Sequence, residues 1–152
     1  MSISTLEQSK ISALEDFLTF VNGEDLRPLA HDYIKAMFAP SFRKPTFIIL
    51  EDGPTIIGAA AFSEEIFTVN TWGISWVSVH PEFRHQGHGQ KLVNACLLEI
   101  SNRITCPSTA LLATYPDKTQ LYERIGFQGL TRDHGGGFFL SLPIFPNKGG
   151  GS

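Results

Sequence analysis

Two glycines and their neighbours form the part of the chain best suited to chemistry. The segment Trp76 to Ile100 reads WVSVHPEFRHQGHGQKLVNACLLEI. Its apolar start ends near Pro81, which removes a strand donor, and after Gly87-His88-Gly89 apolar residues recur at helical spacing. A strand should therefore run into a glycine-bearing turn that opens a helix. Free N–H groups and the positive dipole end at a helix start bind anions, so the turn predicts a pyrophosphate site.

Two common phosphate-binding motifs do not fit this turn. In a P-loop a Lys and a Ser or Thr follow the second glycine, whereas Gln90 and Lys91 stand there in this chain. The dinucleotide fingerprint needs three glycines and an acidic residue about 20 positions later. An ordinary turn before a helix is the remaining alternative. The strand, the proline, the arginine and the amphipathic helix together favour the anion site.

The segment resembles the acetyl-CoA signature of the GNAT N-acetyltransferase superfamily. In that family V-x-P-x-x-[RQ]-x-x-G-x-[GA] joins the fourth strand to the third helix, and Val79, Pro81, Arg84, Gly87 and Gly89 hold those positions here. The resemblance implies acetyl-CoA as co-substrate. Strand N–H groups, that of Val79 favoured, would face the thioester carbonyl, and those of the turn would face the phosphates. The implied cofactor-binding residues are Val77, Ser78, Val79, Arg84, His85, Gln86, Gly87, His88, Gly89 and Gln90.

A second motif, LYERIGF from Leu121 to Phe127, begins some thirty residues after the turn. In the family a helix carrying L-Y-x-x-x-G-F places its Tyr hydroxyl near the sulfur of coenzyme A, so the resemblance implies a catalytic role for Tyr122. Read alone, Tyr122 is more simply an aromatic residue that packs a short helix. A phenol with a pKa of about 10 is protonated at neutral pH and can donate to a departing thiolate.

The base that deprotonates the amine is not evident. A lysine-like amine has a pKa of about 10.4 and is protonated at neutral pH. Many relatives carry a carboxylate on the fourth strand for this purpose, but Trp72 to Val79 contains no Asp or Glu. Glu64, Glu65, His80 or a bound water are the candidates, although two loop glutamates are most simply solvated.

The acceptor and part of the cofactor contact are also left open. Many relatives have Asn seven residues before the Tyr, where this chain has Tyr115, so contacts from Thr114 to Lys118 are uncertain. The first two helices, with segment 38–44 included, and the loop 135–137 are expected to set specificity. The aromatic residues that either line an acceptor pocket or pack the core are Phe42, Trp72 and Trp76.

Composition limits the class of protein. The 152 residues have a net charge of −3 and no Lys/Arg cluster, which argues against a nucleic-acid partner. No apolar run approaches the roughly 20 residues of a membrane helix. The N-terminus is polar, without the apolar core of a signal peptide, so a cytoplasmic protein with no membrane partner is expected. Cys96 should be a buried structural thiol.

No metal is expected. The three histidines near the turn match no zinc motif and should face solvent or phosphate; they are His80, His85 and His88.

Periodicity and turn signals predict an α/β (α+β) fold with the order β-α-α-β-β-β-α-β-α-β-β. This order is that of the GNAT fold: a mixed, mostly antiparallel sheet of six to seven strands with about four helices on both faces. Residues 1–146 should form one domain and 147–152 a flexible Gly-rich tail. The expected strands are 2–6, 46–51, 55–63, 72–79, 109–114, 127–131 and 138–144.

The resemblance implies an N-acetyltransferase that moves acetyl from acetyl-CoA directly to a primary amine of a small molecule, protein or peptide. Homodimers are common in the family. A non-catalytic acyl-CoA sensor on the same fold is the alternative, kept open by the missing strand carboxylate. A transferase for a longer acyl group is a third reading.

Overall fold

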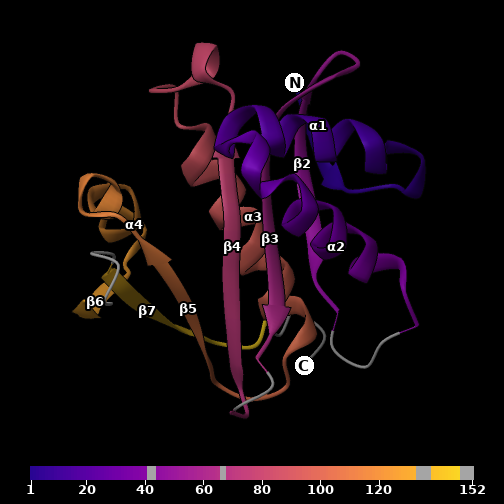
Figure 1. Ribbon diagram of the computed structural model, residues 1–152. Coiled ribbons are helices and arrows are strands. Elements are labelled where there is room, and N and C mark those ends of the chain that lie inside the picture. Colours follow the sequence, from indigo (N-terminus) through magenta and orange to yellow (C-terminus); the bar gives the residue numbers. More distant parts are fainter. Residues whose placement is uncertain (41–43, 66–67, 133–137, 148–152) are drawn as a thin grey trace.

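Seven strands form one sheet in the computed structural model, which describes residues 1–40, 44–65, 68–132 and 138–147 (Figure 1). Every neighbouring pair is antiparallel except β4 with β5. The predicted mixed, mostly antiparallel sheet is confirmed. In spatial order the strands are β1 (Ser2–Thr5), β2 (Thr46–Asp52), β3 (Thr55–Glu64), β4 (Thr71–Val79), β5 (Ser108–Thr114), β7 (Phe138–Ile144) and β6 (Gln128–Arg132).

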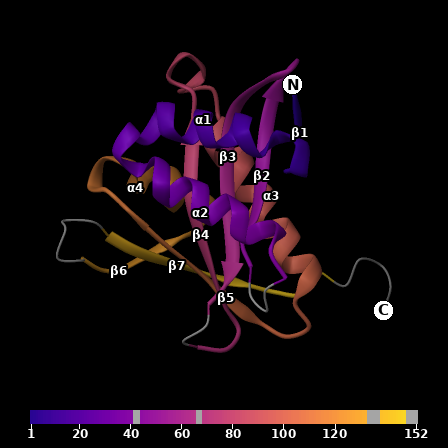
Figure 2. The same cartoon turned by 45° about the vertical axis from the view of Figure 1, so that its right-hand side comes forward.

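Four α-helices within the described residues cover the two faces of this sheet (Figure 2). α1 (Ile11–Asn22) and α2 (Arg27–Phe38) lie on one face, and α3 (His88–Arg103) and α4 (Thr119–Ile125) on the other. Short 3₁₀ turns precede each helix; they are Gln8–Lys10, Glu24–Leu26, Pro81–Phe83 and Pro116–Lys118. Among these helices none combines the length and apolar character needed to cross a bilayer.

The central strands are buried on both sides, which explains their continuous apolar sequence. Along β2, Phe47 and Ile49 pack in the cluster beneath α1 and α2. Ile48 and Leu50 alternate with them and pack in the cluster beneath α3 and α4. Because successive side chains of a strand point to opposite faces, a strand between two helical layers needs apolar residues at every position.

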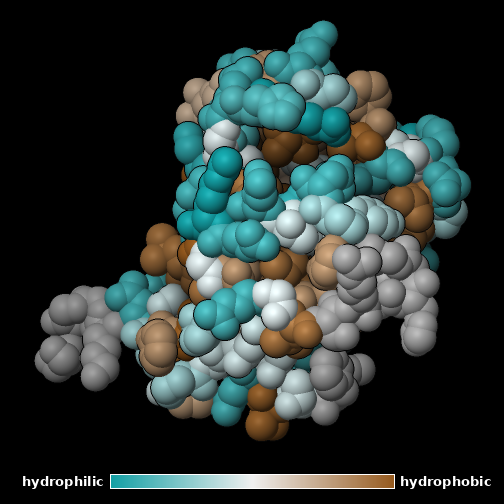
Figure 3. Space-filling view, turned by 90° about the vertical axis from the view of Figure 1, so that its left-hand side faces the viewer, coloured by the Kyte–Doolittle hydropathy of each residue, from teal (hydrophilic) through white to brown (hydrophobic). Residues whose placement is uncertain are grey.

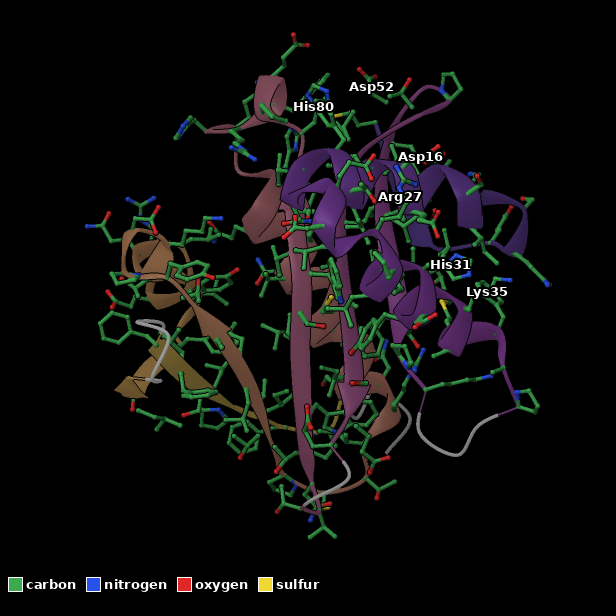
Figure 4. The ribbon with its side chains drawn as sticks, viewed as in Figure 1. Asp16, Arg27, His31, Lys35, Asp52 and His80 are labelled. Carbon is green, nitrogen blue, oxygen red and sulfur yellow. The ribbon has the colours of Figure 1, made fainter. Side chains whose placement is uncertain are left out.

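The α1–α2 pair differs in one detail from the sequence prediction. Helical spacing predicts Leu29, Tyr33, Met37 and Ile34 as the apolar side of α2. The last three pack in the core beneath α1 and α2, but Leu29 is 56% exposed and Ala30 is buried in its place. An ion pair holds the start of this helix against α1, since Arg27 donates to a carboxylate oxygen of Asp16 at 2.9 Å (Figure 4). Surface ion pairs of this kind orient helices more than they stabilise them.

The parallel pair β4–β5 is short, and the two strands then diverge. They pair only from Thr71 to Gly73 on β4. In Figure 1 they meet at their lower ends and separate toward the upper end of β4. A bulge within β4 accompanies this divergence, because the β3 register shifts between Ala59 and Ala61 and Trp76 has a φ of 55°. The upper half of β4 therefore has a strand partner on one edge only.

Candidate functional site

A cleft of about 550 Å³ lies where β4, the start of α3 and α4 meet. Figure 3 views the molecule from the side of β5 and α4, where apolar surface shows between hydrophilic side chains. Every predicted site residue except Gln86 lines the cleft: Val77, Ser78, Val79, Arg84, His85, Gly87, His88, Gly89, Gln90 and Tyr122. Residues from two separate motifs are therefore brought to one place. The lining residues that were not among the predicted site residues are Val21, Asn22, Phe83, Lys118, Leu121 and Arg124.

The start of α3 presents main-chain donors to this cleft. The first N–H of the helix turn with a main-chain partner is that of Lys91, which donates to the carbonyl of Gly87 at 3.1 Å. The N–H groups of His88, Gly89 and Gln90 find no acceptor among the described residues. Gly87 has a φ of 82°, a left-handed conformation that glycine adopts without steric cost. Such a glycine-led helix start is a site for an anion.

The edge of β4 adds one more donor. The N–H of His80 donates to the carbonyl of Ile57 on β3 at 2.8 Å. Because N–H and C=O groups alternate between the two edges of an antiparallel strand, those of Val79 point away from β3 and toward the opening. The Val79 carbonyl accepts there from Nε of Arg84 at 3.1 Å. The Val79 N–H, on the same edge, is thus directed into the cleft.

Tyr122 contributes a protonated phenol. Its side chain is only 6% exposed, and burial, assisted by the nearby Cys96, raises the pKa of Tyr122 to about 12. The ring meets that of Phe127 edge-on at a centroid distance of 6.0 Å. Its hydroxyl has no hydrogen-bond partner within the described part of the chain and lines the cleft. It remains available as a donor for a bound molecule.

The helix end after Tyr122 explains how the chain fixes this residue. The N–H of Phe127 donates to the carbonyl of Tyr122 at 3.0 Å, and Gly126 between them has a φ of 120°. This is the hydrogen-bond pattern of a glycine C-cap, which closes α4 and turns the chain into β6. Phe127 therefore belongs to the helix end, and β6 begins at Gln128 instead of the predicted Phe127.

The three histidines near the turn have three different environments. His85 is exposed. His80 lies above the sheet (Figure 4), where its Nδ1 accepts from the N–H of Glu82 at 3.1 Å. His88 is only 7% exposed, and neither of its ring nitrogens has a partner among the described residues. The prediction that His88 faces solvent was wrong, because its ring lies on the helix face that also buries Leu92 and Cys96. In the described ranges, no three His, Cys, Asp or Glu side chains could hold a metal ion together.

The aromatic candidates for an acceptor pocket lie on opposite faces of the sheet. Trp72 packs against Phe62 at a centroid distance of 6.2 Å, in the layer beneath α3. The ring centroids of Trp76 and Tyr33 lie 6.3 Å apart, in the layer beneath α2. Phe42 and the loop 135–137 lie outside the described residues.

Asn22 is a cleft residue that no local motif could reveal. Its Nδ2 donates to Oγ of Ser78 and to the carbonyl of Leu18, each at 3.0 Å. The last turn of α1 is thereby tied to β4 beside Val79. In the sequence Asn22 is only a helix stop signal, because its partner Ser78 lies far along the chain.

These features define what the cleft can do chemically. Unpaired main-chain N–H groups at the start of α3 suit a diphosphate. A directed N–H on β4 suits a carbonyl oxygen that gains negative charge, and the Tyr122 phenol suits a leaving group that needs a proton. The basic side chains of Arg84, Lys118 and Arg124 line the same space and favour an anionic molecule.

Comparisons with known proteins give a matching family and similar folds. Residues 43–129 match the sequence profile of the family described as acetyltransferase (GNAT) domain. Among curated proteins, none matches the chain in sequence. Similar solved structures include an aminoglycoside 6'-N-acetyltransferase complexed with coenzyme A, with 16% identity, a TM-score of 0.78 and coverage of 97% of this chain and 99% of that one.

Two further structures are similar over most of their length. An aminoglycoside 6'-acetyltransferase type Ii has 19% identity and a TM-score of 0.78, covering 97% of this chain and 99% of that one. The ribosomal-protein-S18-alanine N-acetyltransferase from Escherichia coli has 16% identity and a TM-score of 0.70, covering 96% and 95%. At these identities the likeness establishes the fold.

Proposed function

The chain belongs to the GNAT acetyltransferase family, and on that premise we propose that it binds acetyl-CoA in the cleft and transfers the acetyl group directly to a primary amine. One observation carries the proposal. The free N–H groups at the start of α3, the directed N–H of Val79 and the unpartnered hydroxyl of Tyr122 all line one cleft.

The chain offers a distinct group to each part of the coenzyme. The N–H groups of His88, Gly89 and Gln90 receive the diphosphate, with the left-handed Gly87 leaving room for it. The N–H of Val79 receives the thioester oxygen, and a preorganised donor of this kind lowers the barrier by roughly 3 kcal/mol. Bound there, acetyl-CoA supplies an activated acyl carbon.

The transfer itself needs one bond made and one broken. The neutral amine attacks the acyl carbon, the N–C bond forms and the C–S bond breaks with its electron pair on sulfur. Tyr122 donates its phenolic proton to that sulfur. The nitrogen releases one N–H proton to solvent as the amide forms, and the phenolate regains a proton from solvent. Because its raised pKa keeps the phenol protonated at neutral pH, the donor is present whenever a thiolate departs.

The cysteines favour direct transfer over an acyl-enzyme. Cys96 is fully buried, and burial raises the pKa of its thiol to about 12, so it is neither accessible nor ionised. Cys106 is exposed and lies just before β5. The first residues of β5 pair with the lower end of β4. Sγ of Cys106 lies there 3.4 Å from Oδ1 of Asn70. Neither thiol is placed to attack a thioester beside Val79.

The acceptor is proposed to be an amine-bearing small molecule or a protein or peptide amine. The similar structures named above include enzymes for both kinds of acceptor, an aminoglycoside and a ribosomal-protein alanine. A non-catalytic acyl-CoA sensor is the second candidate, since β4 carries no carboxylate to accept the proton of the amine.

One experiment separates these functions. Acetyl-CoA binding is measured by calorimetry, and thiol release is followed with spermidine, kanamycin, a lysine peptide and a peptide with a free N-terminal alanine. We expect binding, and amine-dependent release with at least one acceptor. Binding without transfer to any amine supports the sensor. Absence of acetyl-CoA binding overturns both. Succinyl-CoA tested in parallel reports whether a longer acyl group is preferred.

A further inference from the structure

The face of the sheet beneath α1 and α2 carries a row of hydroxyl groups in an otherwise apolar layer. Oγ of Ser75 on β4 donates to the hydroxyl of Tyr33 on α2 at 3.4 Å, and that hydroxyl lies 3.5 Å from Oγ of Ser63 on β3. The Tyr33 ring packs edge-on against Phe47. All three hydroxyl residues are partly exposed, so water reaches them. Polar groups in an otherwise apolar layer are expected to be hydrogen-bonded, and these are bonded to one another.

A carboxylate extends this row to the point where β4 and β5 separate. A Cβ placed on Gly73 would lie 2.2 Å from Oε1 of Glu65, so the Glu65 carboxylate fills the space of the missing side chain. Because side chains alternate along a strand, position 73 faces the same side as Ser75. Gly73 is also the last β4 residue that pairs with β5, opposite Leu111. The carboxylate of Glu65 and the hydroxyls of Ser63, Ser75 and Tyr33 are called the polar row below.

The other candidate bases are placed differently. Glu64 lies on the Phe62 side of β3, beneath α3, because the strand alternates and Ser63 between them contacts Tyr33. The Nδ1 lone pair of His80 is already used by the N–H of Glu82, so this ring has no basic nitrogen left for an amine proton.

We infer that Glu65 accepts the proton of the acceptor amine, and so replaces the carboxylate that β4 lacks; this inference rests on the proposed function. At about 3.3 Å of rise per residue, Ser75 lies about 7 Å along β4 from Gly73 and about 7 Å from Val77, where the cleft begins. The polar row thus covers about half of the path from Glu65 to the cleft, the part between Gly73 and Ser75. Water bridges the remaining gaps.

The proton balance is simple. An ammonium group held beside Val77 loses one N–H bond, and its electron pair stays on nitrogen for the attack on the acyl carbon. The proton passes along hydroxyls and water of the polar row and forms an O–H bond on the Glu65 carboxylate. Since Glu65 is partly exposed, it then releases the proton to solvent and returns to the ionised form.

The test compares Glu65→Gln with Glu64→Gln, which makes the same change on the other face. With the best acceptor among the four amines named above, we expect Glu65→Gln to lower kcat/KM about 100-fold at pH 7 and Glu64→Gln to change it less than threefold. The loss should shrink toward pH 10, where roughly a quarter of an amine with a pKa of about 10.4 already arrives neutral, against far less than a hundredth at pH 7. Acetyl-CoA affinity should not change.

Two further variants guard against a merely structural effect. Gly73→Ala forces the Glu65 carboxylate aside without removing it, and should reproduce the pH-dependent loss. The double variant Glu65→Gln, Gly73→Glu restores a carboxylate from β4 itself and should recover at least tenfold. Two results would overturn the inference and leave the proposed function standing. One is that Glu65→Gln is as active as Glu64→Gln at pH 7. The other is that Glu65→Gln loses the same factor in kcat/KM at every pH. A wild-type protein that acetylates none of the amines overturns the proposed function and the inference with it.

Discussion

Nε of Arg84 lies 3.1 Å from the carbonyl oxygen of Val79 and donates to it. A side chain from the loop after β4 thus occupies the strand edge that β5 leaves unpaired. The bond fixes the Val79 peptide edge with its N–H directed into the cleft. Arg84 belongs to the signature that predicted the site. In the structure its partner is the backbone of β4, so its role is to hold the strand as well as to attract phosphate.

Replacing Arg84 tests this bond. Arg84→Ala removes a hydrogen bond worth about 1 kcal/mol. We therefore expect kcat/KM for acetyl-CoA to fall about fivefold and Tm to change little. Lys91→Ala is the control, because it removes a positive charge from an exposed position on the first turns of α3 that does not line the cleft. Equal losses in the two variants would show that charge, and not the Val79 contact, is responsible.

Tyr122→Phe removes the phenolic proton and keeps the ring. Because the hydroxyl has no partner within the described residues, the free energy of unfolding should change by less than about 1 kcal/mol. Loss of a proton donor to sulfur should lower kcat about 100-fold, while calorimetry finds acetyl-CoA affinity near wild type. An unchanged kcat would remove Tyr122 from the mechanism.

The raised pKa of Tyr122 has a defined pH signature. A folded-state pKa of about 12 against about 10 in the unfolded chain means that this group stabilises the fold fully below pH 10. That contribution is lost as the pH rises from 10 to 12. We expect the phenolate absorbance difference between wild type and Tyr122→Phe to develop near pH 12. If the absorbance difference develops near pH 10 while circular dichroism shows that the protein is still folded, the Tyr122 hydroxyl is not buried as described.

The parts of the site that the sequence predicted are local in the chain. Val79 to Gly89 is one uninterrupted strand, turn and helix start, so residue types and spacing predict an anion site there. LYERIGF is also local and includes a glycine C-cap, but the role of Tyr122 came from the family resemblance. Their meeting in one cleft followed from resemblance to a family whose fold is common to many chains.

What the sequence did not predict depends on contacts between distant residues. Asn22 bonds Ser78, and Glu65 fills the space over Gly73, only because α1 and the β3–β4 connection are folded against β4. The placement of β7 between β5 and β6 is likewise a choice of strand pairing that alternation does not encode. The burial of His88 was not predicted, because a single polar residue on an apolar helix face carries no periodic signal.

Gly87 and Gly53 form a matched pair for testing the helix start. Both have positive φ, 82° and 58°, and a Cβ on either would meet no atom within 4 Å. Gly87→Ala and Gly53→Ala should therefore cost similar stability, about 1 kcal/mol. Only Gly87→Ala should weaken acetyl-CoA binding, because Gly53 lies in the β2–β3 turn outside the cleft. Equal affinities for acetyl-CoA in the two variants would argue against phosphate binding at the start of α3.

Lys118 and Arg124 line the cleft, and neither forms an ion pair within the described part of the chain. Their charges are thus available to the phosphates of a bound coenzyme. We expect Lys118→Ala and Arg124→Ala each to weaken acetyl-CoA binding about three- to tenfold at 0.1 M salt. The effect should nearly vanish at 1 M, where the Debye length falls from about 10 Å to about 3 Å.

Lys35→Ala is the control for this salt series, because Lys35 lies on α2, away from α4 (Figure 4). Lys35→Ala changes the net charge by the same amount as the other two substitutions and should leave the affinity for acetyl-CoA unchanged at both salt concentrations. If the Lys118 and Arg124 variants lose affinity equally at 0.1 M and 1 M, the side chains act by packing against the coenzyme. If Lys35→Ala weakens binding as much, the effect arises from net charge, and the anion is not held between α3 and α4.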